Sequence, residues 1–372
     1  MKYKIGYYIL TDIQHIPPVI KVYEKLGGII ITKNQIICDY IQEHYAHLNP
    51  KLELITRTRK ATEIAKKYDL KIIIYTGFQM IHRSYAIQIF HGVSDKHYIE
   101  DKRILKYDLC LVPGQKHIDK FKHAKLYRKK HKFVLAGYPK FDSIVNDSSR
   151  INQIFHNDKP TILYAPTWIS ENSGAKVAFS KFGESSLPGW GKQLIEAVAG
   201  KWNLIIKYHS RINKRTTQIY AEIDEYILEL GLEESVKVVW DADISTYMKQ
   251  ADLLISDISA VCYEWFHFNR PIIFANPSPD NYSPSDDPFS NTYAWNAGDV
   301  LYKKEDIIPC ITENLQSDKF STKRNELLNY AFHKPDGKAL DRQIKIITDY
   351  YDKVASYSKL RIASHNLKKL IH

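Results

Sequence analysis

The strongest constraint on the fold is a strand–turn–helix–strand pattern in residues 251–277, ADLLISDISAVCYEWFHFNRPIIFANP. Its apolar run Leu253–Ser256 predicts a buried strand. The polar turn 257–259 then leads into a predicted helix, Ala260–Asn269, with Ser259 as its N-cap. A second apolar strand follows the helix. Free backbone N–H groups and the positive end of the helix dipole converge at such a turn, which favours phosphate binding.

Two carboxylates accompany this turn. Asp257 lies in the turn itself, and Glu264 lies one turn into the predicted helix. Carboxylates accept hydrogen bonds from hydroxyl groups, whereas backbone amides hold phosphate, so the combination favours a nucleotide or a sugar nucleotide. The alternative is an ordinary β-α-β unit in which Ser259 only caps a helix.

Apolar strands alternate with helical segments along most of the 372 residues. This alternation predicts parallel sheets with helices on both faces, and the length suffices for two domains. We therefore expect an α/β protein with two doubly wound, Rossmann-like domains that face a cleft. The expected strands are Ile5–Leu10, Ile29–Thr32, Leu52–Thr56, Lys71–Tyr75, Ala86–Phe90, Tyr107–Val112, Phe133–Ala136, Thr161–Ala165, Leu204–Tyr208, Val236–Trp240, Leu253–Ser256 and Ile272–Ala275.

The domain boundary is expected in the polar segment Asn146–Lys159, which has no clear hydrophobic period. We predict an N-terminal domain over residues 1–148, a second domain over 149–345 and a basic helical tail over 346–372. The polar, glycine-bearing segment Ser170–Lys192 is expected to form a mobile loop or lid.

The net charge is +11, from 53 Lys and Arg against 42 Asp and Glu, which favours polyanionic partners. Basic residues concentrate in Lys116–Lys132 and beyond Asp352. These runs are either solvated helix faces or attachment sites for an anionic membrane surface. A nucleic-acid binder is the non-enzymatic alternative, but the basic runs lie away from the polar strand ends described below.

Several functional classes find no support in the sequence. Four widely spaced cysteines suggest neither a zinc knuckle nor a redox pair. The N-terminus makes a poor signal peptide, and no window approaches the ~20 apolar residues of a membrane span. Motifs for a P-loop, a strand-linked dinucleotide site, a zincin or a nucleophile elbow are missing. Asp241-Ala-Asp243 has the spacing of a metal-binding DxD, but Asp243 is better explained as a helix cap. Neither a cofactor nor a metal is therefore expected.

Polar or glycine-bearing turns follow five of the predicted strands. In open parallel sheets ligands bind outside the carboxyl ends of the strands, so we expect these turns to carry the site. Two turns lie in the predicted N-terminal domain and three in the predicted second domain. They are His91-Gly92, Gly137–Asp142, Pro166-Thr167-Trp168, His209–Arg211 and Asp257–Ser259.

Histidines head two of these turns. Because histidine side chains generally titrate near neutral pH, His91 can take a proton from a hydroxyl nucleophile, while Gly92 lets the backbone approach a ligand closely. The alternative is a histidine that only completes the turn. His209 and Arg211 form a local cationic cluster that can bind phosphate oxygens through charge-assisted hydrogen bonds. The alternative for them is a basic turn at the surface.

The turn at residues 166–168 has a different composition. Thr167 offers a hydroxyl to phosphate and Trp168 offers a ring face to a base, although each residue is also common at strand ends without a ligand. Gly137-Tyr138-Pro139 is expected to be a shaped turn rather than a catalytic element.

Taken in order, four runs resemble motifs of the CDP-glycerol glycerophosphotransferase family, which builds wall teichoic acids and related capsules. IQIFHGVSDK, Ile87–Lys96, is similar to the strand leading into WHG-T-P-x-K. GYPKFD, Gly137–Asp142, is similar to G-x-P-R-x-D, and ILYAPTW, Ile162–Trp168, to a strand with an A-P-T-W turn. Residues 251–277 are similar to A-D-x-L-I-S-D-Y-S-S-x-x-x-E followed by K-P-I-I-F. Order and spacing agree over about Ala86–Pro277.

The resemblance implies a glycosyltransferase-B fold and peripheral association with the cytoplasmic face of the bacterial membrane. It implies transfer of glycerol phosphate from CDP-glycerol to a hydroxyl of a lipid-linked saccharide acceptor, with release of CMP. His91 would be the base on the acceptor hydroxyl, and His209 would stabilise the pyrophosphate and the leaving CMP. In-line attack on phosphorus needs this division between a base and a positive charge on the leaving side.

Substrate contacts follow from the same resemblance and from the strand-end turns. The diphosphate would lie near Thr167 and Ser259, and the glycerol or ribose hydroxyls near Asp257 and Glu264. The full set of expected substrate-binding residues is Gly92, Pro166, Thr167, Trp168, Arg211, Asp257, Ser259 and Glu264.

Four departures from the family pattern bear on the substrate. Phe90 replaces Trp, and Val93-Ser94-Asp95 replaces T-P-x. Ser210-Arg211 stands where H-P is usual, and Ile258 and Ala260 replace Tyr and Ser of D-Y-S-S. A ribitol-phosphate or another polyol-phosphate donor is compatible with these changes. So is an ordinary glycosyltransferase of the same fold that uses a nucleotide sugar.

Overall fold

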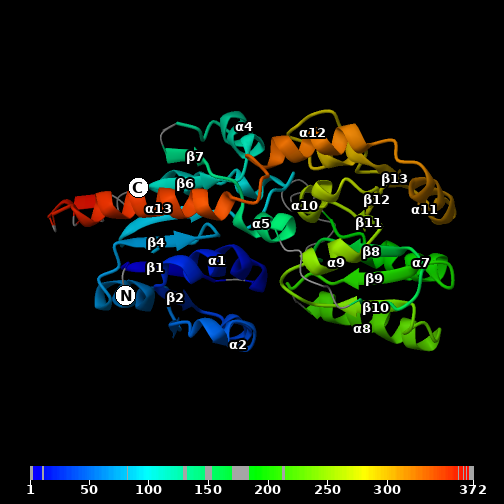
Figure 1. Ribbon diagram of the computed structural model, residues 1–372, viewed down its shortest axis with the longest axis horizontal. Helices are drawn as coiled ribbons and strands as arrows, with labels where there is room; N and C mark the ends of the chain where they lie inside the picture. The colour runs from blue at the N-terminus through cyan, green and yellow to red at the C-terminus, as the bar shows by residue number, and fades with distance from the viewer. Residues whose placement is uncertain are drawn as a thin grey trace. The chain divides into compact units, whose positions relative to one another are not determined.

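A computed structural model describes residues 3–10, 12–81, 83–128, 132–146, 153–169, 184–211, 214–358, 360–362, 364–365 and 367 (Figure 1). The chain forms two compact units, and each unit is assembled from more than one stretch of chain. Unit 1 comprises Met1–Gly92, Glu100–Asp147 and Tyr330–His372, and unit 2 comprises Val93–Ile99 and Ser148–Asn329.

Unit 1 is built on a parallel sheet of seven strands in the order β3-β2-β1-β4-β5-β6-β7. The strand order reverses between β1 and β4, as in a doubly wound sheet. Most strands are isoleucine-rich runs buried along their whole length, the pattern expected where helices cover both faces. The strands are β1 (Ile5–Ile9), β2 (Ile29–Thr32), β3 (Leu52–Leu54), β4 (Ile72–Tyr75), β5 (Tyr85–Ile89), β6 (Leu109–Val112) and β7 (Phe133–Leu135).

Separate apolar cores cover the two faces of this sheet. One contains Val19 of α1 and Ile347 of α13, and the other contains Ala61 of α3 and Phe121 of α4. Burying a side chain the size of Ile347 contributes roughly 1.5–3 kcal/mol. The helices of unit 1 are α1 (Ile16–Leu26), α2 (Gln35–His44), α3 (Thr58–Lys67), α4 (Gln115–His123), α5 (Pro139–Asn146) and α13 (Ala339–Ala355).

Unit 2 has a parallel sheet of six strands in the order β10-β9-β8-β11-β12-β13. Its core joins Leu194 of α7, Tyr220 of α8 and Ile311 of α11 to the central strands. The strands are β8 (Thr161–Ala165), β9 (Asn203–Lys207), β10 (Val236–Val239), β11 (Leu253–Ser256), β12 (Ile272–Ala275) and β13 (Asp299–Leu301). The helices are α7 (Leu187–Val198), α8 (Lys214–Glu229), α9 (Ser245–Gln250), α10 (Val261–Trp265), α11 (Ile307–Gln316) and α12 (Ser321–Ala331), whose last two residues belong to unit 1.

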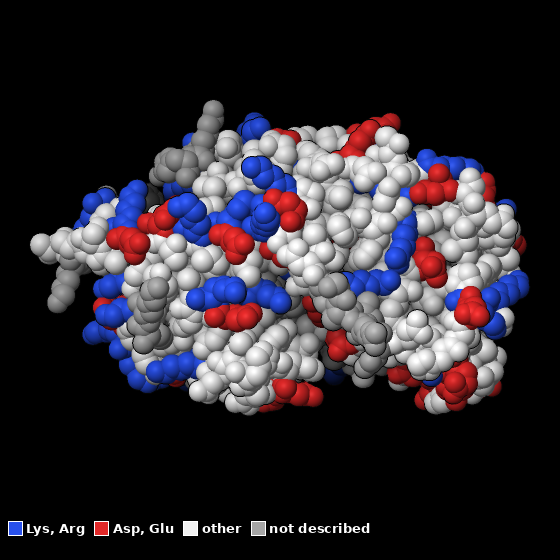
Figure 2. Space-filling view, viewed as in Figure 1, with Lys and Arg blue, Asp and Glu red and all other residues white. Residues whose placement is uncertain are grey.

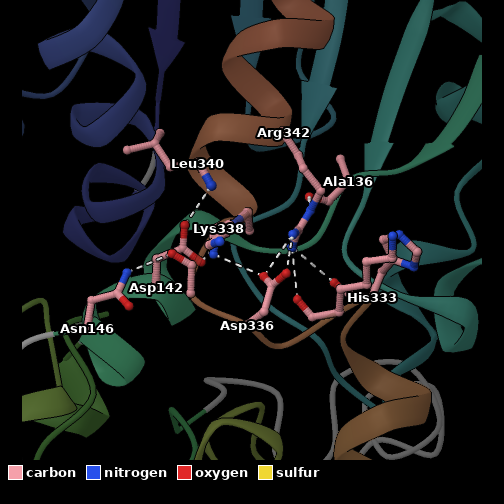
Figure 3. Close-up of polar contacts among 11 residues, drawn as sticks. Ala136, Asp142, Asn146, His333, Asp336, Lys338, Leu340 and Arg342 are labelled. Atoms are coloured by element: carbon pink, nitrogen blue, oxygen red, sulfur yellow. Dashed lines mark hydrogen bonds and ion pairs between the residues drawn. The ribbon is translucent and has the colours of Figure 1, made fainter.

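The start of α13 is held by the turn region that follows β7 (Figure 3). The Asp142 carboxylate accepts hydrogen bonds from the backbone N–H groups of Ala339, at 3.0 Å, and Leu340, at 2.6 Å. These N–H groups lie in the first turn of α13 and have no partner within the helix. Arg342 donates to the carbonyl oxygen of Ala136 at 3.3 Å and pairs with Asp336 at 2.8 Å. The run Gly137–Asp142 therefore clamps a helix that comes almost 200 residues later.

This clamp corrects the predicted end of the second domain. We expected that domain to extend to residue 345 and a separate tail to begin at 346, but α13 crosses both positions and belongs to unit 1. Its side chains Ile347 and Val354 are buried in the unit 1 core. Several residues beyond 358 lie outside the described residues, as do residues 147–152 of the predicted connection.

The segment Val93–Ile99 is a second place where the order of the chain does not match the division into units. It directly follows His91-Gly92 of unit 1 but belongs to unit 2. Buried Asp95 anchors it there. The Tyr263 hydroxyl donates to one oxygen of this carboxylate at 2.6 Å, and the backbone N–H of Ala294 donates to the other at 2.9 Å.

Several elements differ from the sequence prediction, which also missed the edge strand β13. Helix α10 is short, ends in a 3-10 turn at Phe266–Phe268 and has Ala260 at its N-cap position without a side-chain cap. The prediction missed α2, whose N-cap Asn34 accepts from the N–H of Ile36 at 3.0 Å. Helix α7 begins inside the predicted loop Ser170–Lys192, because a proline is tolerated in the first helical turn. Residues 170–183 of that loop lie outside the described residues.

Basic side chains on the face shown in Figure 2 are interspersed with acidic ones, including along the part of unit 1 that α13 crosses. One example is the pair Lys345–Asp349 on α13, at 3.0 Å. The predicted basic run Lys116–Lys132 begins in α4, where Lys116 and Lys120 are fully buried rather than solvated. Within the described part of the chain, no helix is both long enough and apolar enough to cross a bilayer.

Candidate active site

In unit 1, three neighbouring strands bring polar residues to their carboxyl ends. Thr76 directly follows β4, and His91 lies two residues after β5. His15 follows β1 through a short turn and immediately precedes α1. Because β1, β4 and β5 are adjacent in the sheet, these side chains meet at one edge.

His91 is held with one ring nitrogen committed to the backbone. Its Nδ1 lies 3.0 Å from the carbonyl oxygen of Thr76, and a carbonyl only accepts hydrogen bonds. The hydrogen bond therefore places the imidazole proton on Nδ1 and makes Nε2 the acceptor nitrogen of the neutral ring. The Tyr138 hydroxyl donates to the His91 carbonyl oxygen at 2.5 Å, which fixes the backbone of the turn, and Gly92 is buried.

His15 is a neighbour of His91 that the sequence prediction missed. The ring centroids lie 4.1 Å apart at an interplanar angle of 38°. Buried His15 also has its Nδ1 2.8 Å from the Thr76 hydroxyl. One residue, Thr76, thus orients both rings, one through its hydroxyl and one through its carbonyl. The only sequence signal was a histidine just before Pro17-Pro18, after the end of an apolar strand.

A third histidine of this region stays neutral. His117 of α4 is fully buried, and neither of its ring nitrogens has a hydrogen-bond partner among the described residues. Burial, with the charges of Lys120 and Lys116 and the His91 ring nearby, lowers the pKa of His117 well below its usual value. Its ring packs against Phe90 with the centroids 4.8 Å apart.

In unit 2, Thr167 is fixed through its backbone at the end of β8. Its N–H donates to the Asp257 carboxylate at 2.9 Å, and its carbonyl oxygen accepts from the Ser185 hydroxyl at 2.7 Å. The Lys96 ammonium donates to the Thr167 hydroxyl at 2.5 Å. Because this hydroxyl accepts the ammonium hydrogen, it keeps its own hydrogen for a further acceptor.

Lys96 is the second residue that the sequence prediction did not assign, although it ends the quoted run Ile87–Lys96. It reaches Thr167 from the segment Val93–Ile99 and is almost fully buried. Burial, with a smaller contribution from the charge of nearby Arg211, lowers the pKa of Lys96 to about 8 against the opposing charge of Asp257. A buried ammonium beside a hydroxyl donor is suited to an anionic ligand.

Asp257 has a structural task that differs from the predicted one. It is 1% exposed, and its carboxylate accepts from the N–H of Thr167, from the N–H of Ser186 at 2.8 Å and from the Ser186 hydroxyl at 2.9 Å. Burial raises the pKa of Asp257 to about 6, although these hydrogen bonds and Lys96 oppose the shift. The Asp257 carboxylate thus holds the end of β8 and the start of α7 together through Thr167 and Ser186. These hydrogen bonds do not support a contact between Asp257 and a substrate hydroxyl.

The cationic turn after β9 is ordered around His209. The backbone N–H of Arg211 donates to His209 Nδ1 at 3.1 Å, so Nδ1 is an acceptor and the neutral ring carries its proton on Nε2. The Tyr220 hydroxyl donates to the His209 carbonyl oxygen at 3.1 Å. The exposed Arg211 guanidinium lies over the Trp168 ring, 4.1 Å from its centroid. His209 therefore presents a donor, whereas His91 presents an acceptor.

The remaining predicted residues, Ser259, Glu264 and Pro166, lie close in sequence to Asp257 or Thr167. Ser259 is partly exposed, and its hydroxyl lies 3.5 Å from the N–H of Val261, a long contact rather than a firm cap. Glu264 is 4% exposed within α10, and Pro166 is buried between β8 and Thr167.

The two doubly wound units give this chain a fold of the glycosyltransferase-B type, shared with solved structures of low sequence identity. The wall teichoic acid polymerase TagF matches with a TM-score of 0.64 and 16% identity, over 95% of this chain and 90% of that one. Residues 29–349 match the family described as CDP-Glycerol:Poly(glycerophosphate) glycerophosphotransferase. Because the match covers most of the chain, the chain belongs to this transferase family.

Curated relatives are similar over parts of their length. The teichoic acid poly(glycerol phosphate) polymerase of Bacillus subtilis (strain 168) is 26% identical over 204 residues, which are 51% of this chain and 25% of the relative. The teichoic acid poly(ribitol-phosphate) polymerase of Bacillus spizizenii is 24% identical over 191 residues, 51% of this chain and 28% of the relative. The matched region thus spans about a quarter of the length of these relatives.

Proposed function

We propose that the chain transfers glycerol phosphate, or a related polyol phosphate, from a CDP-activated donor to a hydroxyl of a membrane lipid-linked saccharide in teichoic acid or capsule synthesis. CMP is the leaving product. The observation that carries the proposal is that two histidines, in a chain of this family, make opposite kinds of hydrogen bond through their Nδ1 atoms. The Nδ1 of His91 donates to a carbonyl oxygen, which makes Nε2 the acceptor nitrogen of the neutral ring, whereas the Nδ1 of His209 accepts from an N–H group, which puts the ring proton on Nε2.

In the proposed reaction, His91 Nε2 takes the proton of the acceptor hydroxyl as the oxygen attacks the β-phosphorus of the donor. The new P–O bond forms as the bond between this phosphorus and the oxygen bridging to the α-phosphate breaks. CMP leaves with the bonding electron pair. Proton transfer by a positioned histidine contributes typically 10²–10⁴-fold.

The groups of unit 2 suit the leaving side. Lys96 and Arg211 supply positive charge, and the Thr167 hydroxyl and His209 Nε2–H supply hydrogen-bond donors. Charge-assisted hydrogen bonds to phosphate are about twice as strong as neutral ones. Asp257 contributes indirectly, because it fixes the N–H groups of Thr167 and Ser186. Ser259 and Glu264 are retained as proposed substrate contacts on the adjacent turn and helix.

A lipid-linked acceptor locates the proposed reaction at the cytoplasmic face of the membrane. The net charge of +11 supports attraction to an anionic lipid surface. Cosedimentation with vesicles that contain an anionic phospholipid should fall as salt rises from ~0.1 M to ~1 M, because the Debye length shrinks from ~10 Å to ~3 Å. Binding that ignores both salt and lipid charge would remove the electrostatic part of the proposal.

The decisive experiment supplies the purified chain with a lipid-linked saccharide and with CDP-glycerol, CDP-ribitol or UDP-linked sugars in separate reactions. We expect acceptor-dependent release of CMP from a CDP-polyol. A reaction without acceptor measures simple hydrolysis, and His91→Ala measures the background. Release of UDP from a nucleotide sugar, with no CMP from either CDP-polyol, would instead identify a glycosyltransferase.

A further inference from the structure

Trp240 is an exposed aromatic residue at the carboxyl end of β10, the edge strand of the unit 2 sheet. Its exposed fraction is 40%, whereas Trp190, Trp265 and Trp295 of the same unit are at most 7% exposed. It directly follows the residue pair Val239–Lys207 of β10 and β9. The neighbouring N–H of Tyr208 donates to the Val239 carbonyl oxygen at 3.0 Å, so the two aromatic residues leave adjacent strands side by side.

One face of the Trp240 indole is covered by other aromatic rings. Tyr208 and Tyr220 are stacked at 3.8 Å with an interplanar angle of 3°. The indole is nearly perpendicular to both, at 82° and 84°, with centroid distances of 5.3 Å and 5.0 Å. Because the indole centroid is nearly equidistant from the two phenol centroids, the indole lies beside the stacked pair and not on top of it. Centroid separations of about 5 Å between perpendicular rings are typical of the edge of one ring against the face of the other. The phenol edges thus cover one indole face, and the exposed area belongs to the rest of the ring.

The backing of this platform is fixed by polar contacts. The Tyr208 hydroxyl donates to Asp224 at 3.0 Å, and the Tyr220 hydroxyl donates to the carbonyl oxygen of His209 at 3.1 Å. Tyr220 therefore supports both the indole and the His209 turn. A rigid aromatic surface with one face open loses little conformational entropy when a planar ring stacks on it.

From this geometry we infer that the open face of Trp240 is the stacking platform for the pyrimidine base of the donor nucleotide. The inference rests on the proposed function. β10 and β9 are neighbours, so about 4.8 Å separates the strand that ends at Trp240 from the one that ends at the phosphate-binding His209 turn. Base and phosphates of one nucleotide can then occupy successive strand ends. Trp168, the residue predicted from the sequence to offer a ring face to the base, carries the Arg211 guanidinium over its ring, 4.1 Å from the centroid.

A saccharide can also stack on an indole, so the test must separate a base from a sugar. Binding of CMP, of ribose 5-phosphate and of the saccharide part of the acceptor is measured by calorimetry on the full chain and on Trp240→Leu and Trp240→Phe. Leu keeps apolar area without an aromatic face, whereas Phe keeps a smaller aromatic face. Leu230→Ala, another exposed apolar side chain of unit 2, is the matched control.

We expect Trp240→Leu to weaken CMP binding about 10-fold to 100-fold, the range for loss of one base–aromatic stack. Trp240→Phe should recover most of the affinity, and ribose 5-phosphate should bind all variants equally. Unchanged CMP affinity in Trp240→Leu overturns the inference, as does an equal loss for ribose 5-phosphate or a loss seen only for the saccharide. Failure of the wild-type chain to bind CMP at all overturns both the platform and the proposed donor.

The two proposals fail separately in other cases. If Trp240→Leu weakens CMP binding but no CDP-polyol yields CMP, the platform stands and the proposed transfer fails. If CMP release is normal and Trp240→Leu leaves the KM for the donor unchanged, the transfer stands and the platform fails. Equal melting temperatures of the variants would show that the half-exposed side chain is not needed for folding.

Discussion

The two units have the same sheet type but equip their strand ends differently. Unit 1 has several imidazoles: His15 and His91 both contact Thr76, and buried His117, whose pKa is lowered, packs against Phe90. Unit 2 collects cations and hydrogen-bond donors around buried Asp257. An imidazole that carries its proton on Nδ1 is suited to accept a proton at Nε2, whereas an ammonium, a guanidinium and an N–H group are suited to hold phosphate. One fold thus presents two different sets of chemical groups at its strand ends.

The first test of this contrast removes the base. His91→Ala should lower acceptor-dependent CMP release by about 10²–10⁴-fold, because the variant lacks the general base that takes the proton of the acceptor hydroxyl. Donor affinity should stay at the wild-type level. The rate and the donor Kd are measured separately, with His47→Ala as the exposed-histidine control. Weak donor binding with a normal rate at saturation would reassign His91 to the donor.

The second test removes a donor from unit 2. His209→Ala should lower kcat by about 10²–10³-fold, the usual cost of losing one hydrogen bond to a developing negative charge. Arg211→Ala should raise the KM for the donor, because the lost charge acts on the bound diphosphate as well. Lys214→Ala removes an exposed charge at the start of α8 and serves as the control. If His209→Ala and Lys214→Ala behave alike, the assignment of the leaving side is wrong.

The third test concerns the neighbouring imidazoles of His15 and His91, whose rings are tilted at 38° to each other. We expect His15→Ala to lower kcat by about 10-fold to 10²-fold without changing the KM for the donor, because His91 loses a ring that orients it. His15→Phe keeps a stacked ring, and His15→Asn keeps a polar contact to Thr76. If stacking positions His91, only Phe restores the rate. Loss of thermal stability in all three variants, with an unchanged kcat, would reduce His15 to a packing residue.

The fourth test uses pH to separate the units. Lys96 has its pKa lowered to about 8, so raising the pH through 8 removes its proton and its charge. The kcat/KM for the donor should fall about tenfold per pH unit above that value. Lys96→Arg keeps its charge at every accessible pH and should remove this descending limb. An identical limb in both proteins would exclude Lys96 as its source.

The smallest effect is expected far from the chemistry, at the clamp on α13. Asp142→Ala removes the acceptor for the N–H groups of Ala339 and Leu340 and should cost about 0.5–2 kcal/mol in the free energy of unfolding. Denaturant melts measure the loss, and hydrogen exchange should show it first in α13. Asp349→Ala, which breaks only an exposed pair, should change stability by less.

The sequence predicts the strands well, because runs such as Ile72–Tyr75 and Thr161–Ala165 are apolar, β-branched and bounded by turn residues. It also predicts that His91 and His209 lie just beyond strand ends, because each follows such a run. It does not predict His15 or Lys96, whose roles depend on contacts with Thr76 and Thr167, 61 and 71 positions away. For Asp257 it predicts the position but not the task, since burial is a property of the packed turn.

The clamp between Asp142 and α13 also has a consequence for synthesis on the ribosome. Translation proceeds at about 5–20 residues per second and domains usually fold in the order of their appearance. Here every residue of unit 2 leaves the ribosome before α13, while most of unit 1 waits for its last helix with an apolar face uncovered. The first unit to begin is thus the last to be completed. A premature stop near the C-terminus would expose the core of the unit translated first.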